Sequence, residues 1–166
     1  MKTVYFLLAL ELVISVCLAQ NNTPYRIFFT TDSAKIDTVK SKDGNFISVT
    51  YTVSLDLNGD QKAEKFEADE VNCGTGGCLW TIYDGKTKKE IGNIEGEFVY
   101  ILKEKKNGFP LVETYWRNGG DAAIVHYYAF GSTGYAEIKS NDLNEKEMDE
   151  YFESKPQMSD EFKELK

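Results

Sequence analysis

The sequence contains a single histidine, His126, and it lacks the signatures of the common enzyme classes. No Gly-x-Ser-x-Gly elbow, phosphate-binding glycine loop or dinucleotide-binding fingerprint occurs in its 166 residues. Hydrolysis usually requires a nucleophile with a base, or a metal with an activated water. We therefore expect a binding protein and not an enzyme. His126 is expected to be an ordinary residue of a β-sheet, and a catalytic base is the alternative for it.

Positive charge is scarce as well, since 19 lysines and arginines face 27 aspartates and glutamates, for a formal net charge of −8. Such a chain repels the phosphates of nucleic acids and of anionic membranes. The charge therefore argues against both as the main partner. A basic protein is favoured instead, although the sequence does not identify it.

Long apolar runs are limited to the N-terminus. Lys2 precedes a mostly apolar stretch over residues 4–18, and Cys17-Leu18-Ala19 has the small-x-small pattern of a cleavage site. We predict a signal peptide over residues 1–19. The charge of Glu11 and the short span make a membrane anchor the less favoured alternative. The mature chain is thus expected to be periplasmic or secreted, without a membrane span.

Removal of this leader leaves two cysteines, Cys73 and Cys78, which are separated by Gly-Thr-Gly-Gly. An even number of cysteines in an exported chain indicates a disulfide. The glycines allow the sharp reversal that a bridge between such close residues requires. Two sulfurs and one histidine are too few for a structural zinc site. We predict a structural disulfide between Cys73 and Cys78, with a redox-active pair as the alternative.

Residues 20–140 are predicted to form one mainly β domain. Short stretches of alternating or β-branched residues are separated by glycine-bearing turns, which is typical of an antiparallel meander. This pattern predicts a sandwich or a partly open barrel. The expected strands cover residues 25–30, 46–57, 65–71, 79–84, 96–102, 111–116, 122–130 and 135–138.

Residues 141–166 differ in character and predict an acidic helical tail packed on the β domain. Asn141 or Asp142 can cap a helix, and Pro156 would end it. Nine acidic residues against four basic ones make a docking arm for a cationic partner the alternative. The apolar stripe that would pack on the sheet comprises Leu143, Met148, Tyr151 and Phe152.

Residues 56–67, Asp-Leu-Asn-Gly-Asp-Gln-Lys-Ala-Glu-Lys-Phe-Glu, space acidic oxygens as a calcium loop does. Asp56, Asn58 and Asp60 occupy positions 1, 3 and 5, from which such loops direct side-chain oxygens at the ion. The preceding residues, 46–55, alternate polar and apolar side chains and predict a strand. The loop is therefore expected to connect two strands, unlike an EF-hand loop, which connects two helices.

The remaining ligands of this predicted calcium site come from the second half of the loop. The carbonyl of Lys62 would supply position 7, and either Glu64 or Glu67 would complete the site from position 9 or 12. Gln61 replaces the glycine that is usual at position 6, so a metal-free polar turn is the alternative. Calcium binding is expected to be weak, as in extracellular modules.

The form Asp-x-Asn-Gly-Asp-x-x-x-Glu after a strand resembles the calcium loops of the FG-GAP and VCBS type, which many secreted β proteins contain. Over residues 53–83, this loop is followed by Cys-Gly-x-Gly-Gly-Cys and an aromatic strand, and the combination is similar to a group of small uncharacterised bacterial exported proteins. The resemblance implies a fold type, a calcium loop beside a disulfide and an exported location. It implies no known activity.

Two further stretches bear on a partner. Residues 115–121 begin with Tyr-Trp-Arg and offer rigid contact area with a planar donor group, but burial of these aromatic rings in the core is favoured. Residues 131–135, Gly-Ser-Thr-Gly-Tyr, are loosely similar to the Ser-Gly-x-x-Tyr loop of periplasmic lysozyme inhibitors, in a different order. An inhibitor or immunity protein of a cationic hydrolase is therefore the alternative function.

Overall fold

The computed structural model describes residues 24–40 and 47–155, and the expected leader over residues 1–19 lies outside them. The end of the acidic tail, residues 156–166, also lies outside the described residues. Within the described part of the chain, no helix is long and apolar enough to cross a membrane.

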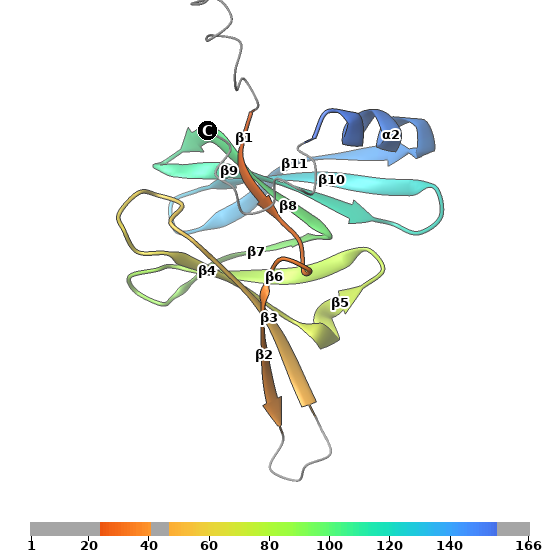
Figure 1. The fold of residues 1–166 in the computed structure, drawn as a ribbon. Helices are drawn as coiled ribbons and strands as arrows, with labels where there is room; N and C mark the ends of the chain where they lie inside the picture. Colours follow the sequence, from red (N-terminus) through yellow and green to blue (C-terminus); the bar gives the residue numbers. More distant parts are fainter. Residues whose placement is uncertain (1–23, 41–46, 156–166) are drawn as a thin grey trace, which may run out of the picture.

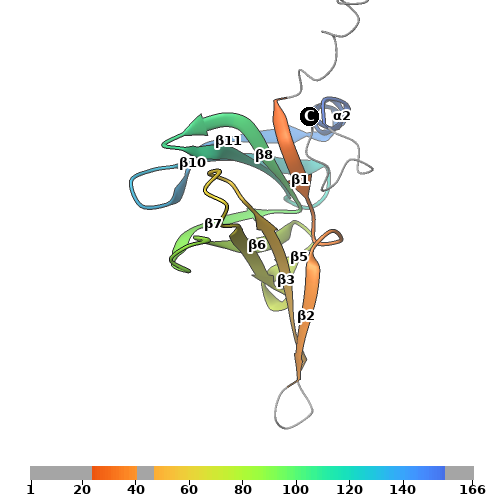
Figure 2. The same ribbon diagram turned by 60° about the vertical axis from the view of Figure 1, so that its left-hand side comes forward.

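The described residues form two antiparallel sheets and one α-helix, with the sheets stacked as two layers (Figures 1 and 2). The first sheet has the strand order β1-β8-β9-β10-β11, and the second has the order β2-β3-β4-β6-β5 with β7 paired to β6. The fold is therefore mainly β, as the sequence pattern predicts, and the sheets do not close into a barrel. The elements are β1 (Tyr25–Phe29), β2 (Lys35–Lys40), β3 (Ile47–Leu55), β4 (Glu64–Asp69), the 3-10 helix η1 (Glu70–Asn72), β5 (Cys73–Gly74), β6 (Gly77–Tyr83), β7 (Glu90–Gly96), β8 (Phe98–Lys106), β9 (Phe109–Arg117), β10 (Ala122–Phe130), β11 (Tyr135–Asn144) and α2 (Glu145–Glu153).

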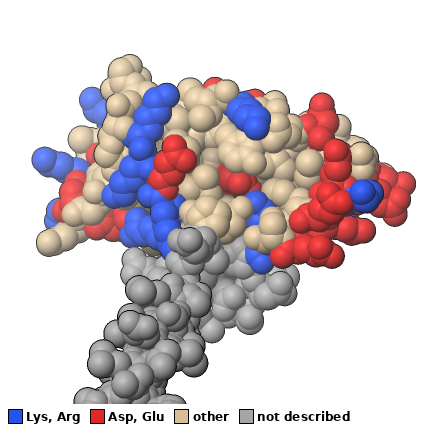
Figure 3. All heavy atoms as spheres, turned by 90° about the horizontal axis from the view of Figure 1, so that it is seen from above, with Lys and Arg blue, Asp and Glu red and all other residues tan. Residues whose placement is uncertain are grey.

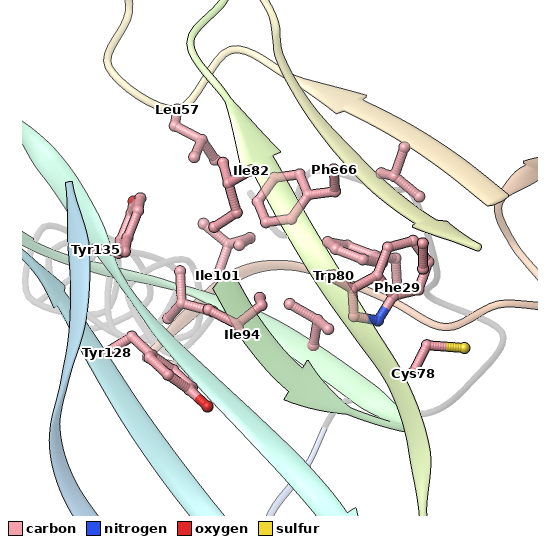
Figure 4. Close-up of a cluster of buried hydrophobic side chains, with 14 of the residues drawn as sticks. Phe29, Leu57, Phe66, Cys78, Trp80, Ile82, Ile94, Ile101, Tyr128 and Tyr135 are labelled. Atoms are coloured by element: carbon pink, nitrogen blue, oxygen red, sulfur yellow. The ribbon is translucent and has the colours of Figure 1, made fainter. Parts of the chain in front are cut away.

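The main hydrophobic core lies between the two sheets, because alternate residues of a strand point to the same side. Phe66 of β4 and Trp80 of β6 face side chains of the first sheet such as Phe29 and Ile101. The ring of Phe29 meets the rings of Phe66 and Trp80 edge-on, with centroids 5.0 and 5.4 Å apart. Figure 4 shows these side chains converging from both layers. Burial of each large side chain contributes about 1.5–3 kcal/mol to folding.

Helix α2 covers the outer face of the first sheet. Its N-cap is Asn144, whose side chain accepts from the Glu147 N–H at 3.1 Å, while the Glu147 carboxylate accepts from the Asn144 N–H at 2.9 Å. This reciprocal capping box satisfies two backbone donors at the start of the helix. Met148, Tyr151 and Phe152 of the helix pack on the sheet around Tyr115, and Leu143, which the sequence placed in the same stripe, belongs to β11 and joins this cluster.

The helix begins later than the expected caps indicate. β11 continues to Asn144, and within it Asn141 and Asp142 pair with Val125 and Ile124 of β10. Asparagine and aspartate favour caps because their side chains bond nearby backbone groups. Here pairing with β10 satisfies the backbone N–H and C=O groups of these residues, and Asn144 is the N-cap instead.

Two strands lack the alternation that predicts a strand, β2 and β7. In β7, Gly92 takes a φ of +149° against β11, where an added Cβ would lie 2.8 Å from the Tyr135 Cβ. A glycine is thus required for this close approach. Conversely, the strand expected over residues 65–71 ends at Asp69, where η1 begins.

Candidate functional site

The candidate calcium loop, residues 56–64, connects β3 to β4, and Asp56 organises its first half. Its Oδ1 accepts from the N–H of Gly59 at 2.8 Å, and its Oδ2 accepts from the N–H of Gln61 at 3.0 Å. Gln61 takes the left-handed conformation, with φ of 66°, at the position where an EF-hand loop has glycine. This conformation costs a residue with a Cβ about 1–2 kcal/mol. The glutamine therefore takes the required turn despite its side chain.

The other two side chains predicted as ligands close short turns further along the loop. Asn58 Oδ1 accepts from the N–H of Asp60 at 2.9 Å, and Asp60 Oδ1 accepts from the N–H of Lys62 at 2.8 Å. Each such oxygen carries a second lone pair that one N–H does not use. The loop is thus ordered by its own acidic and amide groups, which keep acceptor capacity.

Glu64, the first residue of β4, is fully buried at 0% exposure beneath the loop. Its Oε2 accepts from the N–H of Leu57 at 2.8 Å, and its Oε1 lies 3.4 Å from Asn58 Nδ2. Burial raises the pKa of the Glu64 carboxyl. Hydrogen bonds from backbone N–H groups such as those of Leu57 and Gly85 lower this pKa, and the charge of Asp60 raises it. Among the described residues, no lysine or arginine forms an ion pair with Glu64. Backbone N–H groups and the donating side-chain amide of Asn58 hold this carboxylate.

The turn between β6 and β7 packs against the loop at Gly85. A Cβ added to Gly85 would lie 2.4 Å from the carbonyl oxygen of Lys62 and 2.6 Å from that of Ala63, so only glycine fits. Asp84 orders this turn, because its Oδ1 accepts from the Thr87 hydroxyl at 2.6 Å. That bond and backbone N–H groups lower the pKa of Asp84. The carbonyl of Lys62, an expected calcium ligand, therefore lies at the contact between loop and turn.

Glu67, the second candidate for closing the calcium site, lies elsewhere. Alternation along β4 turns Glu64 inward and Glu67 outward, where its carboxylate pairs with Lys65. Glu64 is therefore the acidic residue of β4 that reaches the loop. Arg26 of β1 brings a positive charge to the base of the loop by donating to the Leu57 carbonyl at 3.4 Å.

No three His, Cys, Asp or Glu side chains within residues 24–40 and 47–155 have the arrangement of a metal site. In the loop, the oxygens of Asp56, Asp60 and Glu64 are directed at backbone N–H groups. Coordination of a cation by all three would require their carboxylates to rotate toward a common point.

The predicted disulfide is present. Cys73 and Cys78 are bonded with an S–S distance of 2.01 Å and face each other across the β5–β6 hairpin. Cys78 is 1% exposed and belongs to the main core. The hairpin is clamped against β9, because a Cβ at Gly76 would lie 2.5 Å from the Trp116 ring. The disulfide and the ring therefore fix this end of the second sheet.

His126 is buried on β10, between carboxylates of β7 and β11. Its Nε2 lies 3.4 Å from Glu95 Oε1 and its Nδ1 lies 3.3 Å from Glu137 Oε2. Neither contact has hydrogen-bond geometry, so both ring nitrogens are buried without a hydrogen-bond partner. No described hydroxyl or thiol forms a hydrogen bond with the ring.

The aromatic residues that begin the stretch 115–121 serve packing. Tyr115 is 2% exposed under α2, and its hydroxyl donates to the sulfur of Met148 at 3.1 Å. Trp116 is half-buried against Gly76. Tyr115 thus belongs to the core, whereas Trp116 stays partly exposed next to the exposed Arg117.

The β10–β11 turn, residues 131–134, borders a shallow open hollow of about 390 Å³ between this turn and the start of β7. Ser132 and Thr133 are exposed at its tip. Tyr135 is buried in the core, and its hydroxyl donates to the Pro110 carbonyl at 2.9 Å. The turn thus presents the serine but not the tyrosine of the loosely similar inhibitor loop.

A buried ion pair that the sequence pattern does not reveal joins the end of α2 to the first sheet. Lys155 and Glu113 are 9% and 3% exposed, and the Lys155 ammonium donates to the Glu113 carboxylate and to the Tyr25 hydroxyl. The Tyr151 hydroxyl donates to the same carboxylate at 2.7 Å. Glu113 and Tyr25 lie 42 and 130 positions from Lys155 in the sequence, so no local motif relates them to it.

Surface charge is unevenly distributed. On the face seen in Figure 3, acidic side chains gather on the side where α2 lies, and a group of lysines and arginines lies on the opposite side. The exposed carboxylates of α2 are Glu145, Glu147, Asp149, Glu150 and Glu153.

No protein-family model matches this chain, and neither a curated protein nor a solved structure matches it. The chemistry of the loop, the ion pair and the charged surface is therefore the basis for a functional proposal.

Proposed function

We propose that the protein is an exported, non-catalytic binding protein whose loop over residues 56–64 is stabilised by Ca²⁺. The observation that carries the proposal is the fully buried Glu64 carboxylate, whose pKa is raised by burial and also by the charge of Asp60, and with which no described lysine or arginine forms an ion pair. Carboxylate charges repel each other, and a nearby positive charge relieves that repulsion. A divalent cation would supply this positive charge.

The donor groups match the preference of Ca²⁺ for oxygen. Those that would hold the ion are the side chains of Asp56, Asn58, Asp60 and Glu64 and the carbonyl of Lys62. Water would complete the six to eight ligands that the ion takes. Glu67, which points away from the loop, has no part in the proposed site.

The exported location rests on two features. Residues 1–19 have the pattern of a signal peptide, and the Cys73–Cys78 disulfide is of a kind that persists in oxidising compartments. Extracellular calcium modules bind with dissociation constants of about 0.1–1 mM, which suits the calcium levels outside cells.

The proposal is tested by thermal unfolding of the mature chain in Ca²⁺ and in EDTA. At a Kd of about 0.1 mM, 10 mM Ca²⁺ stabilises the fold by about 2.7 kcal/mol, which raises the Tm by about 5–10 °C. Asp60→Asn keeps an oxygen for the Lys62 N–H and removes only the charge, so most of the rise should be lost. Asp121→Asn, in an exposed turn outside the loop, is the matched control and should keep it. An equal rise in the wild type and in Asp60→Asn would contradict the proposal.

The alternative function is inhibition of a cationic exported hydrolase, and the acidic surface of α2 is the observation that favours it. Opposite charges steer association and make it sensitive to salt. Binding to a lysozyme-like enzyme at low salt should weaken at least tenfold in the triple variant Asp149→Asn, Glu150→Gln, Glu153→Gln. The control triple variant Asp32→Asn, Asp69→Asn, Asp121→Asn removes the same charge elsewhere. Equal binding by both variants, or no binding at low salt, would remove the alternative.

A further inference from the structure

The buried ion pair between Lys155 and Glu113 lies inside a group of tyrosine rings. The Lys155 ammonium lies 3.9 Å from the ring centroid of Tyr151, 4.6 Å from that of Tyr25 and 5.2 Å from that of Tyr100. All three distances are within the range over which an aromatic face attracts a cation. The ammonium also donates to the Glu113 carboxylate and the Tyr25 hydroxyl. We name Tyr25, Tyr100, Glu113 and Tyr151 the tyrosine cage.

Three of the four cage residues belong to the first sheet and do not depend on α2. Tyr25, Tyr100 and Glu113 lie on β1, β8 and β9, which are neighbours in strand order. Tyr100 and Glu113 are directly opposite each other, and the rings of Tyr25 and Tyr100 have centroids 5.4 Å apart. Only Tyr151 comes from the helix. The sheet therefore provides most of the site before any cation occupies it.

Helix α2 has anchors other than Lys155. Met148 accepts from the Tyr115 hydroxyl, and the ring of Phe152 lies 4.8 Å from that of Tyr115 and 5.5 Å from that of Phe98. Lys155, by contrast, lies beyond the last residue of the helix. The helix is therefore held on the sheet by contacts that do not involve Lys155.

The cage binds the ammonium group by chemistry that is independent of the chain that carries it. Burial lowers the pKa of Lys155, and the charge of Glu113 opposes this effect. Moving a cation out of water costs free energy unless a counter-charge and hydrogen-bond acceptors for its N–H groups replace the water. Here the carboxylate, the Tyr25 hydroxyl and the ring faces replace it. Another lysine side chain could make the same contacts.

We propose that the tyrosine cage is a binding site for the ammonium group of a lysine side chain on a partner protein, and that Lys155 occupies it in cis until that partner binds. The proposal deepens the binding role proposed above and rests on it, but it does not involve the calcium loop. Because the ammonium donates to both Glu113 and Tyr25, a ligand needs at least two N–H donors. A primary ammonium group fits this requirement, whereas a quaternary one does not.

The experiment is calorimetric titration of Lys155→Ala with butylammonium chloride, which reproduces the end of a lysine side chain. Binding should be saturable and at least tenfold tighter than to the wild type, in which Lys155 competes. Tetramethylammonium at the same ionic strength should bind at least tenfold more weakly. Equal signals from the two cations, or no saturable binding by a folded Lys155→Ala protein, would overturn the proposal.

Two further variants assign the result to a site. The double variant Glu113→Gln, Lys155→Ala keeps the rings and removes the carboxylate, so it should bind butylammonium at least tenfold more weakly than Lys155→Ala. Equal affinities would show that the cation binds elsewhere. Adding Asp60→Asn to Lys155→Ala should leave butylammonium binding unchanged, which separates failure of this site from failure of the calcium loop.

A second measurement uses the native chain and does not depend on the folding of a variant. The N–H groups of Ser154 and Lys155 donate to the carbonyls of Tyr151 and Phe152 at 3.2 and 3.1 Å. Butylammonium that displaces Lys155 should speed hydrogen exchange at these two amides and leave the preceding turns of α2 unchanged. Unchanged exchange rates at a butylammonium concentration a hundred times that which half-saturates Lys155→Ala would show that Lys155 is not displaced from the cage. That result would overturn the proposal.

Discussion

Glu64 and Glu113 are both buried carboxylates, at 0% and 3% exposure, yet their charges are balanced in different ways. Glu113 is paired with the Lys155 ammonium and also accepts from the Tyr151 hydroxyl. Glu64 accepts from backbone N–H groups and from the Asn58 side-chain amide, and the charge of Asp60 contributes to raising its pKa. The first site contains its own cation, whereas no described lysine or arginine forms an ion pair with Glu64.

This difference indicates how each region responds to a ligand. A cation that enters the tyrosine cage must compete with Lys155, so its apparent affinity is reduced by the cis occupant. A cation at the loop competes with no side-chain cation of Glu64 and relieves repulsion directly. Loss of a carboxylate is therefore expected to destabilise the cage strongly and the calcium-free loop less.

The largest effect is expected for Glu113→Gln. This change leaves the buried Lys155 ammonium without its counter-charge, which costs about 3–5 kcal/mol in free energy of unfolding. Urea unfolding followed by fluorescence measures it. The double variant Glu113→Gln, Lys155→Met should recover most of the loss, because a neutral pair of similar size needs no counter-charge. A single variant as stable as the wild type would contradict a structural role for the pair.

A smaller effect is expected for Glu64→Ala in EDTA. It removes the acceptor of the buried Leu57 N–H, and an unsatisfied buried donor costs about 1–3 kcal/mol. Glu64→Gln keeps an acceptor oxygen and removes the charge, so in EDTA it should be at least as stable as the wild type. Chemical unfolding of the three proteins compares them. Equal losses in the alanine and glutamine variants would show that the charge itself is needed without calcium.

The pH dependence of the loop should be smaller still and has a definite sign. Burial raises the folded-state pKa of Glu64 above its ordinary value of 4.5. The stability that this shift contributes is fully present below the unfolded pKa and is lost as the pH rises through the raised folded pKa. In EDTA, the wild type should therefore lose stability relative to Glu64→Gln between pH 4 and pH 8. A constant difference over that range would argue against a raised pKa.

Asp84, in the neighbouring turn, provides the opposite case for comparison. Bonds from Thr87 lower its pKa below 3.8, so the stability it contributes is present above the unfolded pKa and is lost as the pH falls. The difference between the wild type and Asp84→Asn should therefore shrink toward low pH.

Local patterns were sufficient to predict the mainly β fold and the disulfide. Along residues 122–130, alternation places Tyr128 toward the main core and Val125 toward α2, because a strand has a period of two. Cys73 and Cys78 are close enough in sequence for the glycines between them to determine the hairpin. The helix start was predicted too early, with a cap at Asn141 or Asp142, because the pairing of these residues with β10 is a tertiary effect.

The sites were less predictable for the same reason. The sequence did not determine whether Glu64 or Glu67 lies at the loop. On β4, Glu64 shares the inward face with Phe66, so Glu64 is the one that reaches the loop. The tyrosine cage joins Lys155 to Tyr25, 130 residues away in the sequence. Only the packing of α2 on the first sheet brings such residues together.

The most direct test of the central claim is calorimetric titration of the mature, oxidised chain with Ca²⁺, beside Asp60→Asn. We predict one Ca²⁺ per chain with a Kd of about 0.1–1 mM, and at least tenfold weaker binding in the variant. Absence of binding up to 10 mM Ca²⁺, or equal binding by both proteins, would contradict a calcium site formed by residues 56–64.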